Sequence, residues 1–102
     1  MDKAQTAWAG IDVGKTHHWV CVLDAEGNKL SSMKVANDQS DLTATIATVA
    51  GLADRIVWAI DIVGAPSAML LALLIQAGQS VRYASGRVVA SLSRILCKSE
   101  VT

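Results

Sequence analysis

The stretch "GIDVGKTHHWV", residues 10–20, decides how the chain can fold, because its centre admits two opposed interpretations. Gly14-Lys15-Thr16 matches the end of a nucleotide-binding P-loop, a pattern that also needs a glycine where this chain has Ala9. A P-loop leads directly into a helix, whereas residues 17–24, "HHWVCVLD", are rich in β-branched and aromatic residues and predict a strand. We therefore interpret the stretch as two strands joined by a tight turn, with Asp12 as its chemical centre and no nucleotide-binding residues.

The composition is that of a single globular domain, residues 1–102, with 52% hydrophobic residues and a formal net charge of zero. A neutral chain has no overall electrostatic attraction to nucleic acid or to a membrane surface. The longest apolar run, residues 68–75, is far shorter than the roughly 20 residues that span a bilayer. The first ten residues lack the apolar segment of a signal peptide. We expect a cytoplasmic protein with no membrane partner.

The hydrophobic pattern predicts an α/β fold with the element order βββαβαβα. Three strands form an antiparallel meander, and the "RIVWAID" strand at residues 55–61 is apolar enough to be buried on both faces of a parallel sheet. "NDQSD" supplies cap residues for a helix that carries Leu42, Ile46, Val49 and Ala53 at helical spacing. The predicted strands cover about residues 7–13, 17–23, 29–36, 55–61 and 80–84, with the later helices starting near Pro66 and Ser85 and Gly78 ending the former.

This order brings two aspartates together. A strand–helix–strand unit crosses over right-handedly and lays its strands parallel, so we expect residues 55–61 beside residues 7–13 in a mixed sheet. Asp12 and Asp61 would then end neighbouring strands about 5 Å apart. Carboxylates that close repel each other, and Mg²⁺ or Mn²⁺, which prefer oxygen ligands, would relieve the repulsion. We predict that Asp12 and Asp61 are metal ligands and catalytic residues; the plainer alternative is that Asp12 starts a turn and Asp61 caps a helix.

Other polar residues give weaker signals. A zinc site on His17, His18 and Cys21 is disfavoured, because adjacent residues of a strand point to opposite faces. Basic side chains late in the chain recur at helical spacing and can neutralise backbone phosphates, although a solvated helix face gives the same pattern. A turn lysine after Asp12 has the same two interpretations. The candidate nucleic-acid contacts are Lys15, Arg82, Arg87, Arg94 and Lys98.

The two longest patterned stretches resemble a known family. "AGIDVGKTHHWVCVLDAEGNKL", residues 9–30, and "VWAIDIVGAPSAMLLALLIQAGQSVRYASGR", residues 57–87, resemble the N-terminal catalytic domain of the insertion-sequence 110 family of transposases, the RuvC-like DEDD transposases of bacterial mobile elements. The resemblance covers about residues 7–90 and is specific in the order and spacing of both stretches.

The resemblance implies an RNase H-like fold and a four-acid site that holds divalent metal for phosphodiester cleavage and transfer in DNA transposition. The first acid matches Asp12, and the second, commonly glutamate in the family, falls at Asp61. The third and fourth acids belong to a stretch resembling Gly-Glu-x-Lys-Thr-Asp-x-x-Asp-Ala, which these 102 residues do not contain; Glu100 is not spaced to replace it, and the family's serine-bearing domain is likewise not among them. The implied partners are DNA, a structured RNA and further copies of the transposase. We expect these residues alone to be inactive, which leaves their status as an enzyme open.

Two other interpretations fit parts of the sequence. An actin-like or sugar-kinase ATPase fragment also opens with an aspartate-glycine hairpin, but its phosphate-binding turn usually carries small residues where this chain has Lys15 and His17-His18. Alternatively, the chain is a decayed remnant of a transposase with no function.

Overall fold

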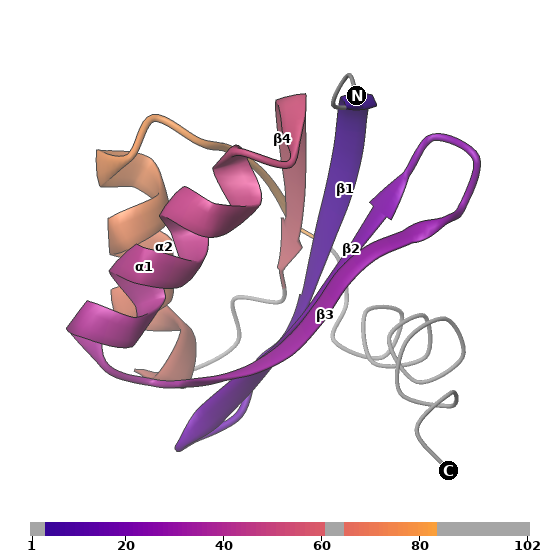
Figure 1. The fold of residues 1–102 in the computed structure, drawn as a ribbon. Coiled ribbons are helices and arrows are strands. Elements are labelled where there is room, and N and C mark those ends of the chain that lie inside the picture. Colours follow the sequence, from indigo (N-terminus) through magenta and orange to yellow (C-terminus); the bar gives the residue numbers. More distant parts are fainter. Residues whose placement is uncertain (1–3, 61–64, 84–102) are drawn as a thin grey trace, which may run out of the picture.

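A computed structural model describes residues 4–60 and 65–83 of the chain. Its elements follow the predicted order, with one additional turn of 3₁₀ helix before the second α-helix (Figure 1). The helix predicted from Ser85 lies outside the described residues. The elements are β1 (Ala4–Asp12), β2 (His17–Asp24), β3 (Lys29–Ala36), α1 (Gln39–Ala50), β4 (Ala53–Ile60), η1 (Ala65–Ser67), α2 (Ala68–Gln76) and β5 (Ser80–Tyr83).

The described strands form one sheet with the order β3-β2-β1-β4-β5, so β1 is central. β1 pairs antiparallel with β2, and β2 with β3, which gives the predicted meander. On its other edge β1 pairs in parallel with β4, and β4 pairs in parallel with β5. The mixed sheet and the position of β4 beside β1 confirm the predicted topology.

Hydrogen bonds within the turn fix the β2–β3 hairpin. The carboxylate of Asp24 accepts the backbone N–H groups of Glu26 and Asn28 at 3.0 and 2.8 Å. These bonds, that from Asn28 foremost, lower the pKa of Asp24 because they stabilise its ionised form. Gly27 has a φ of 85°, a conformation that side chains with a Cβ rarely adopt. The hairpin turn, together with a bulge between Val22 and Leu23, therefore sets the register in which β3 lies against β2.

The two α-helices among the described residues cover the same face of the sheet (Figure 1). α1 begins at its N-cap Asp38, whose carboxylate accepts the N–H of Asp41 at 3.0 Å, as the "NDQSD" stretch predicted. Leu42, Ile46 and Val49 are buried against the sheet. These three residues confirm the helical spacing read from the sequence.

The prediction that Ala53 belongs to the same helical face is wrong. α1 ends at Ala50, where the N–H of Gly51 bonds back to the carbonyl of Thr48. Ala53 starts β4 instead and pairs with Ala4 of β1. The helical pattern continues by coincidence, because a buried alanine suits the first position of a strand that is covered by helices.

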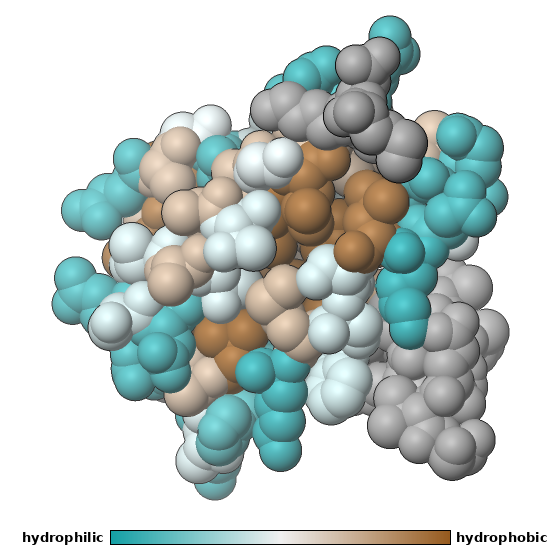
Figure 2. All heavy atoms as spheres, in the orientation of Figure 1, coloured by the Kyte–Doolittle hydropathy of each residue, from teal (hydrophilic) through white to brown (hydrophobic). Residues whose placement is uncertain are grey.

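The core lies between the helices and the inner face of the sheet. Ala7, Ala9 and Ile11 of β1 are wholly buried there, and the small alanines leave room for the indole of Trp58 on β4. Trp58 is also wholly buried, and its Nε1 donates to Oε1 of Gln79 at 2.9 Å. In the orientation of Figure 1, hydrophilic side chains surround a more hydrophobic centre (Figure 2). Within residues 4–60 and 65–83, no helix is long and apolar enough to cross a bilayer.

We expect Trp58→Ala to lower the free energy of unfolding by about 3–5 kcal/mol, because it leaves a cavity in the core and an amide without its indole partner. The matched control is Trp8→Ala, since Trp8 is 44% exposed and should lose only about 1 kcal/mol or less. Urea unfolding followed by circular dichroism measures both changes. Equal losses in the two variants would contradict the core described above.

Candidate functional site

Asp12 is the last residue of β1, at the carboxyl end of the central strand. The parallel register of β1 and β4 runs up to Ile11 and Ile60, and both of these side chains are wholly buried. Asp12 and Asp61 follow those two residues in the sequence, but Asp61 lies outside the described residues. The neighbouring parallel strands that the two-aspartate site requires are therefore present, while the approach of the two carboxylates stays a prediction.

Asp12 and two further side chains form a row across the three strands of the meander. Asp12 pairs with Trp19 of β2, and Trp19 pairs with Lys34 of β3. Directly paired residues point to the same side of a sheet, and Ile11 points to the helices, so this row emerges on the face turned away from α1 and α2. The indole Nε1 of Trp19 donates to Oγ of Ser32 at 2.9 Å, which restrains the ring.

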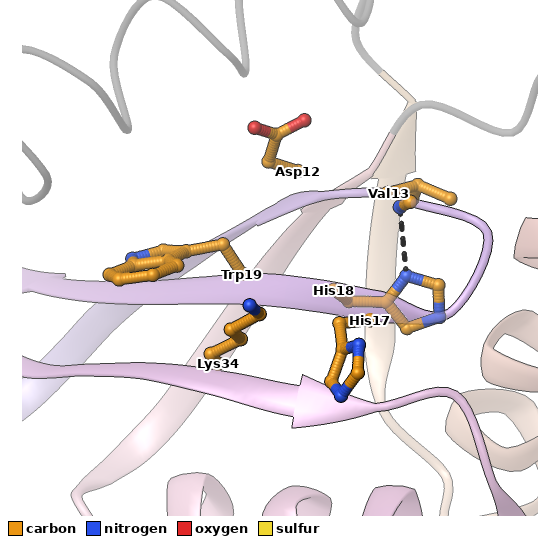
Figure 3. A pocket seen from close by; sticks show the side chains of 7 residues that line it. Asp12, Val13, His17, His18, Trp19 and Lys34 are labelled. Atoms are coloured by element: carbon orange, nitrogen blue, oxygen red, sulfur yellow. Dashed lines mark hydrogen bonds between the residues drawn. The ribbon is translucent and has the colours of Figure 1, made fainter.

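A pocket of about 420 Å³ follows this row and extends to the turn after β1. Asp12 and Trp19 are half-buried in it, and Lys34 is exposed. Figure 3 shows the three side chains on adjacent strands, with the two histidines of β2 at the end of the pocket near the turn. An acid, a flat aromatic ring and a cation thus share one concave surface.

The turn that follows Asp12 is held by a buried histidine. The backbone N–H of Gly14 donates to Nδ1 of His18 at 3.2 Å (Figure 3), and Nε2 of His18 lies 3.1 Å from Oδ1 of Asn37. The Asn37 amide in turn donates to the carbonyl of Lys15 at 3.3 Å, and its backbone N–H donates to the carbonyl of Thr16 at 2.8 Å. Asn37, which follows β3, therefore holds the turn both directly and through the imidazole of His18.

This arrangement requires a neutral imidazole. Because Nδ1 of His18 accepts a hydrogen bond, its proton must be on Nε2, which then donates to Asn37. Burial lowers the pKa of His18 below its usual value of 6.5, since only 1% of the residue is exposed. The hydrogen bond to Asn37 opposes this shift, and the nearby His17 adds to it.

The turn requires glycine at position 14 because there is no space for a side chain there. A Cβ at this position would collide with the backbone carbonyl oxygen of His17. The glycine that made the stretch look like a P-loop therefore allows the chain to reverse tightly, and the residues that follow form β2 and not a helix.

The other predicted contacts fall in different places. Lys15 is exposed in the turn, and Arg82 is exposed on β5, where its register with Ala59 and Gly10 puts it on the same face as Asp12. Arg87, Arg94 and Lys98 lie outside the described residues. These five residues remain predicted nucleic-acid contacts.

The two histidines do not form a metal site with each other. His17 is exposed and His18 is buried, which confirms that they point to opposite faces of β2. Among residues 4–60 and 65–83, no three His, Cys, Asp or Glu side chains gather in a way that could hold a metal ion.

Sequence reasoning missed Trp19, Lys34 and the role of His18. The pairing of the first two could not be found by counting outward from the hairpin turn, because a bulge between Val22 and Leu23 shifts the register by one residue. The histidine could have been suspected because it alternates with Val20 and Val22, which face the core. Its hydrogen-bond partner Asn37 has no signal in the sequence.

Comparison with known proteins places the chain in a family. The family model for DEDD transposases of the IS110 type, described as a transposase, matches residues 9–99. The chain belongs to the IS110 family of transposases.

Two curated relatives agree with this assignment. The chain is 46% identical over 86 residues to the 44.8 kDa protein of insertion element IS116 from Streptomyces clavuligerus, and 46% identical over 88 residues to the 42 kDa protein of insertion element IS900 from Mycobacterium paratuberculosis. Each match covers 84% of this chain but 21% and 22% of the relatives, so the chain spans about a fifth of their length.

A solved structure supports the fold. T. thermophilus RuvC in complex with a Holliday junction substrate superposes with a TM-score of 0.55 at 18% identity, over 95% of this chain and 74% of RuvC. At this identity the likeness concerns the fold alone, and it confirms the predicted RNase H-like, RuvC-like sheet of this IS110 domain. With the family match, it favours a transposase domain over the actin-like or sugar-kinase alternative.

We expect His18→Ala to lower the free energy of unfolding by about 1–3 kcal/mol, because it leaves the N–H of Gly14 and the amide of Asn37 without their partner. The exposed His17 provides the control, and His17→Ala should change stability by no more than about 0.5 kcal/mol. Denaturant unfolding at pH 8 or so measures both. Equal effects would show that the imidazole does not clamp the turn.

The stability that His18 provides should depend on pH. Its pKa is lowered in the folded state, so the unfolded chain binds the proton first. The contribution is complete above the usual histidine pKa of 6.5 and declines as the pH falls from there through the lowered pKa. The stability difference between the wild type and His18→Ala should therefore shrink on acidification. A difference that is constant or grows would contradict the neutral tautomer.

Proposed function

We propose that Asp12 binds a divalent cation, Mg²⁺ or Mn²⁺, together with Asp61, in the catalytic domain of a DNA transposase that cleaves and transfers phosphodiester bonds. The observation that supports this most directly is the place of Asp12, a half-buried carboxylate that ends the central strand of a RuvC-like sheet and lines a polar pocket. Asp61 follows the strand that pairs in parallel with β1.

The donor chemistry fits a hard cation. Carboxylate oxygens are the ligands that Mg²⁺ and Mn²⁺ prefer, and the pocket at Asp12 has room for metal-bound waters. When bound, such a cation activates an attacking oxygen and stabilises the leaving oxygen of a phosphodiester. The protein's own contribution is positional. β1 holds the Asp12 backbone between β2 and β4, and the His18 clamp fixes the turn that immediately follows it.

DNA is the substrate class that this function requires. The structurally similar RuvC is bound to a Holliday junction, and the two curated relatives are encoded by insertion elements. On this chain, the exposed Lys15, Lys34 and Arg82 are cations near or on the face that carries Asp12, and they can contact backbone phosphates. We propose them as phosphate contacts, with Arg87, Arg94 and Lys98 as further candidates.

The complete reaction needs groups beyond those described. Four acids are expected in the family, and these residues supply Asp12 and Asp61. Because the relatives are about five times as long as the matched segment, the serine-bearing domain, a structured RNA and further transposase copies are proposed as partners of the whole protein. The 102 residues alone should accordingly bind a cation weakly and not cut DNA.

We expect Asp12→Asn to abolish binding of Mn²⁺, which the wild-type chain should bind with an affinity on the order of millimolar, because Mn²⁺ like Mg²⁺ binds weakly to few carboxylates. Paramagnetic broadening of backbone amide signals measures this and locates the ion. The matched control is Asp24→Asn, which alters a half-buried aspartate at the far end of β2, outside the pocket, and should leave Mn²⁺ binding unchanged. Broadening that persists at residues 12–14 in Asp12→Asn would overturn the proposal.

Incubation with insertion-element end DNA and Mn²⁺ should produce no specific cleavage by the 102-residue chain. The physical reason is that two-metal chemistry needs more carboxylates than two to hold both ions. Gel electrophoresis of labelled DNA measures the products. Cleavage that is lost in Asp12→Ala would show that these residues suffice for the chemistry, contrary to our expectation.

A further inference from the structure

We propose that Trp19 and Lys34 bind an unpaired nucleotide of a DNA strand beside Asp12, with the base stacked on the indole and the phosphate at the ammonium group. This inference rests on the proposed function of the Asp12 site, because it states which form of DNA, a single strand, binds beside that site. It adds a named binding surface, the Trp19–Lys34 surface, that comes from β2 and β3.

Trp19 has the properties of a stacking platform. It is half-buried in a pocket, beside the carboxylate-bearing end of β1. The hydrogen bond from its Nε1 to Ser32 holds the ring in one orientation, so little side-chain freedom remains to be lost when a base stacks on it. Stacking on an aromatic ring tolerates any base, because every base has a flat π-face.

Lys34 is placed for the phosphate of the same nucleotide. It is directly paired with Trp19 on the neighbouring strand, about 5 Å away along the sheet. Its side chain is exposed and lines the same pocket (Figure 3). A lysine that neutralises one backbone phosphate releases counterions, which makes the binding sensitive to salt.

The shape of the surface favours an unpaired strand over a duplex. In a duplex the faces of the bases are stacked on one another, and a protein ring reaches them only after the base has left the stack. The pocket is an open depression of about 420 Å³, which has room for one nucleotide. The surface therefore fits a single strand next to Asp12.

Asp12 itself has a definite effect on this binding. Its carboxylate lines the same pocket as Lys34 and repels a phosphate when no divalent cation is present. Asp12→Asn should therefore bind single-stranded DNA more tightly than the wild type in buffer that contains a chelator. Because the chelator removes divalent cations, this comparison measures the effect of Asp12 on DNA binding separately from its effect on metal binding.

Tryptophan fluorescence tests the stacking without disturbing the pocket. Trp58 is wholly buried, so in the Trp8→Phe variant a base that quenches fluorescence reports on Trp19. We expect oligothymidylate to quench this variant strongly, and a duplex of the same length to quench it little. The quenching should vanish when Trp19→Phe is added, because only Trp58 then remains. Equal quenching by duplex and single strand, or quenching that survives Trp19→Phe, would overturn the inference.

Affinities measured by fluorescence anisotropy test the energetic contribution. Trp19→Leu should weaken binding of oligothymidylate by roughly ten-fold, whereas Trp19→Phe should retain most of the affinity. The control Trp8→Leu alters a tryptophan of β1 that lies on the same face of the sheet but outside the pocket. It should change affinity by about two-fold or less. Equal losses in Trp19→Leu and Trp8→Leu would contradict the stacking role. Unfolding curves check that each variant is folded. If Trp19→Leu does not fold, the quenching assay still tests the stacking role, because it uses Trp19→Phe.

The salt dependence tests the lysine. Lys34→Gln should reduce the slope of log affinity against log salt by about one phosphate contact. Lys29→Gln, on the same strand but outside the pocket, should leave the slope unchanged. An unchanged slope in Lys34→Gln would overturn the phosphate contact. If oligouridylate binds more tightly than oligothymidylate and quenches Trp19 equally, the surface binds RNA, and the choice of DNA is overturned.

The two proposals fail in different ways. If Asp12→Asn abolishes Mn²⁺ binding while Trp19 and Lys34 variants bind DNA normally, the Trp19–Lys34 surface is wrong and the metal site stands. If Trp19 is quenched by single-stranded DNA but Mn²⁺ binds independently of Asp12, the proposed function is wrong.

Discussion

The double pairing of β1 is the constraint on which the rest of the structure depends. Every other strand is positioned from it, antiparallel on the side of β2 and parallel on the side of β4. Its residues alternate between two environments, so Ala7, Ala9 and Ile11 face the helices while Asp12 emerges on the opposite face. A shift of one residue would bury the carboxylate and expose the core, which is why the register is strongly specified.

The turn after β1 is also the place where the fold restricts the choice of residues most clearly. The chain must reverse within four residues to start β2, and it does so with Gly14 against a backbone carbonyl and with the N–H of Gly14 on His18. A neutral imidazole buried among apolar side chains then connects this turn to Asn37 at the end of β3. Stability and site geometry are thereby coupled, because the hydrogen bonds that close the meander also position the residues after Asp12.

Family membership and local geometry give different parts of the functional argument. The IS110 match establishes a domain of the transposase family, and the structural likeness establishes a RuvC-like fold. The pairing registers bring the carboxylate of Asp12, the ring of Trp19 and the ammonium group of Lys34 into one pocket, and we propose that they bind a cation, a base and a phosphate. These residues span about a fifth of the length of the curated relatives.

The sequence by itself determined the order of the elements, the strand–turn–strand at residues 10–20, the placement of Asp12 at a strand end and the family. These features follow from local patterns: alternation in β2, helical spacing at Leu42, Ile46 and Val49, and the turn residues between them. The extension of that spacing to Ala53 failed, because the parallel pairing with β1 recruits this residue into β4. Only the tertiary structure decided which side chains stand beside Asp12 and what His18 does. Those neighbours come from other strands, and their positions depend on pairing registers and hydrogen bonds between residues that no linear pattern connects.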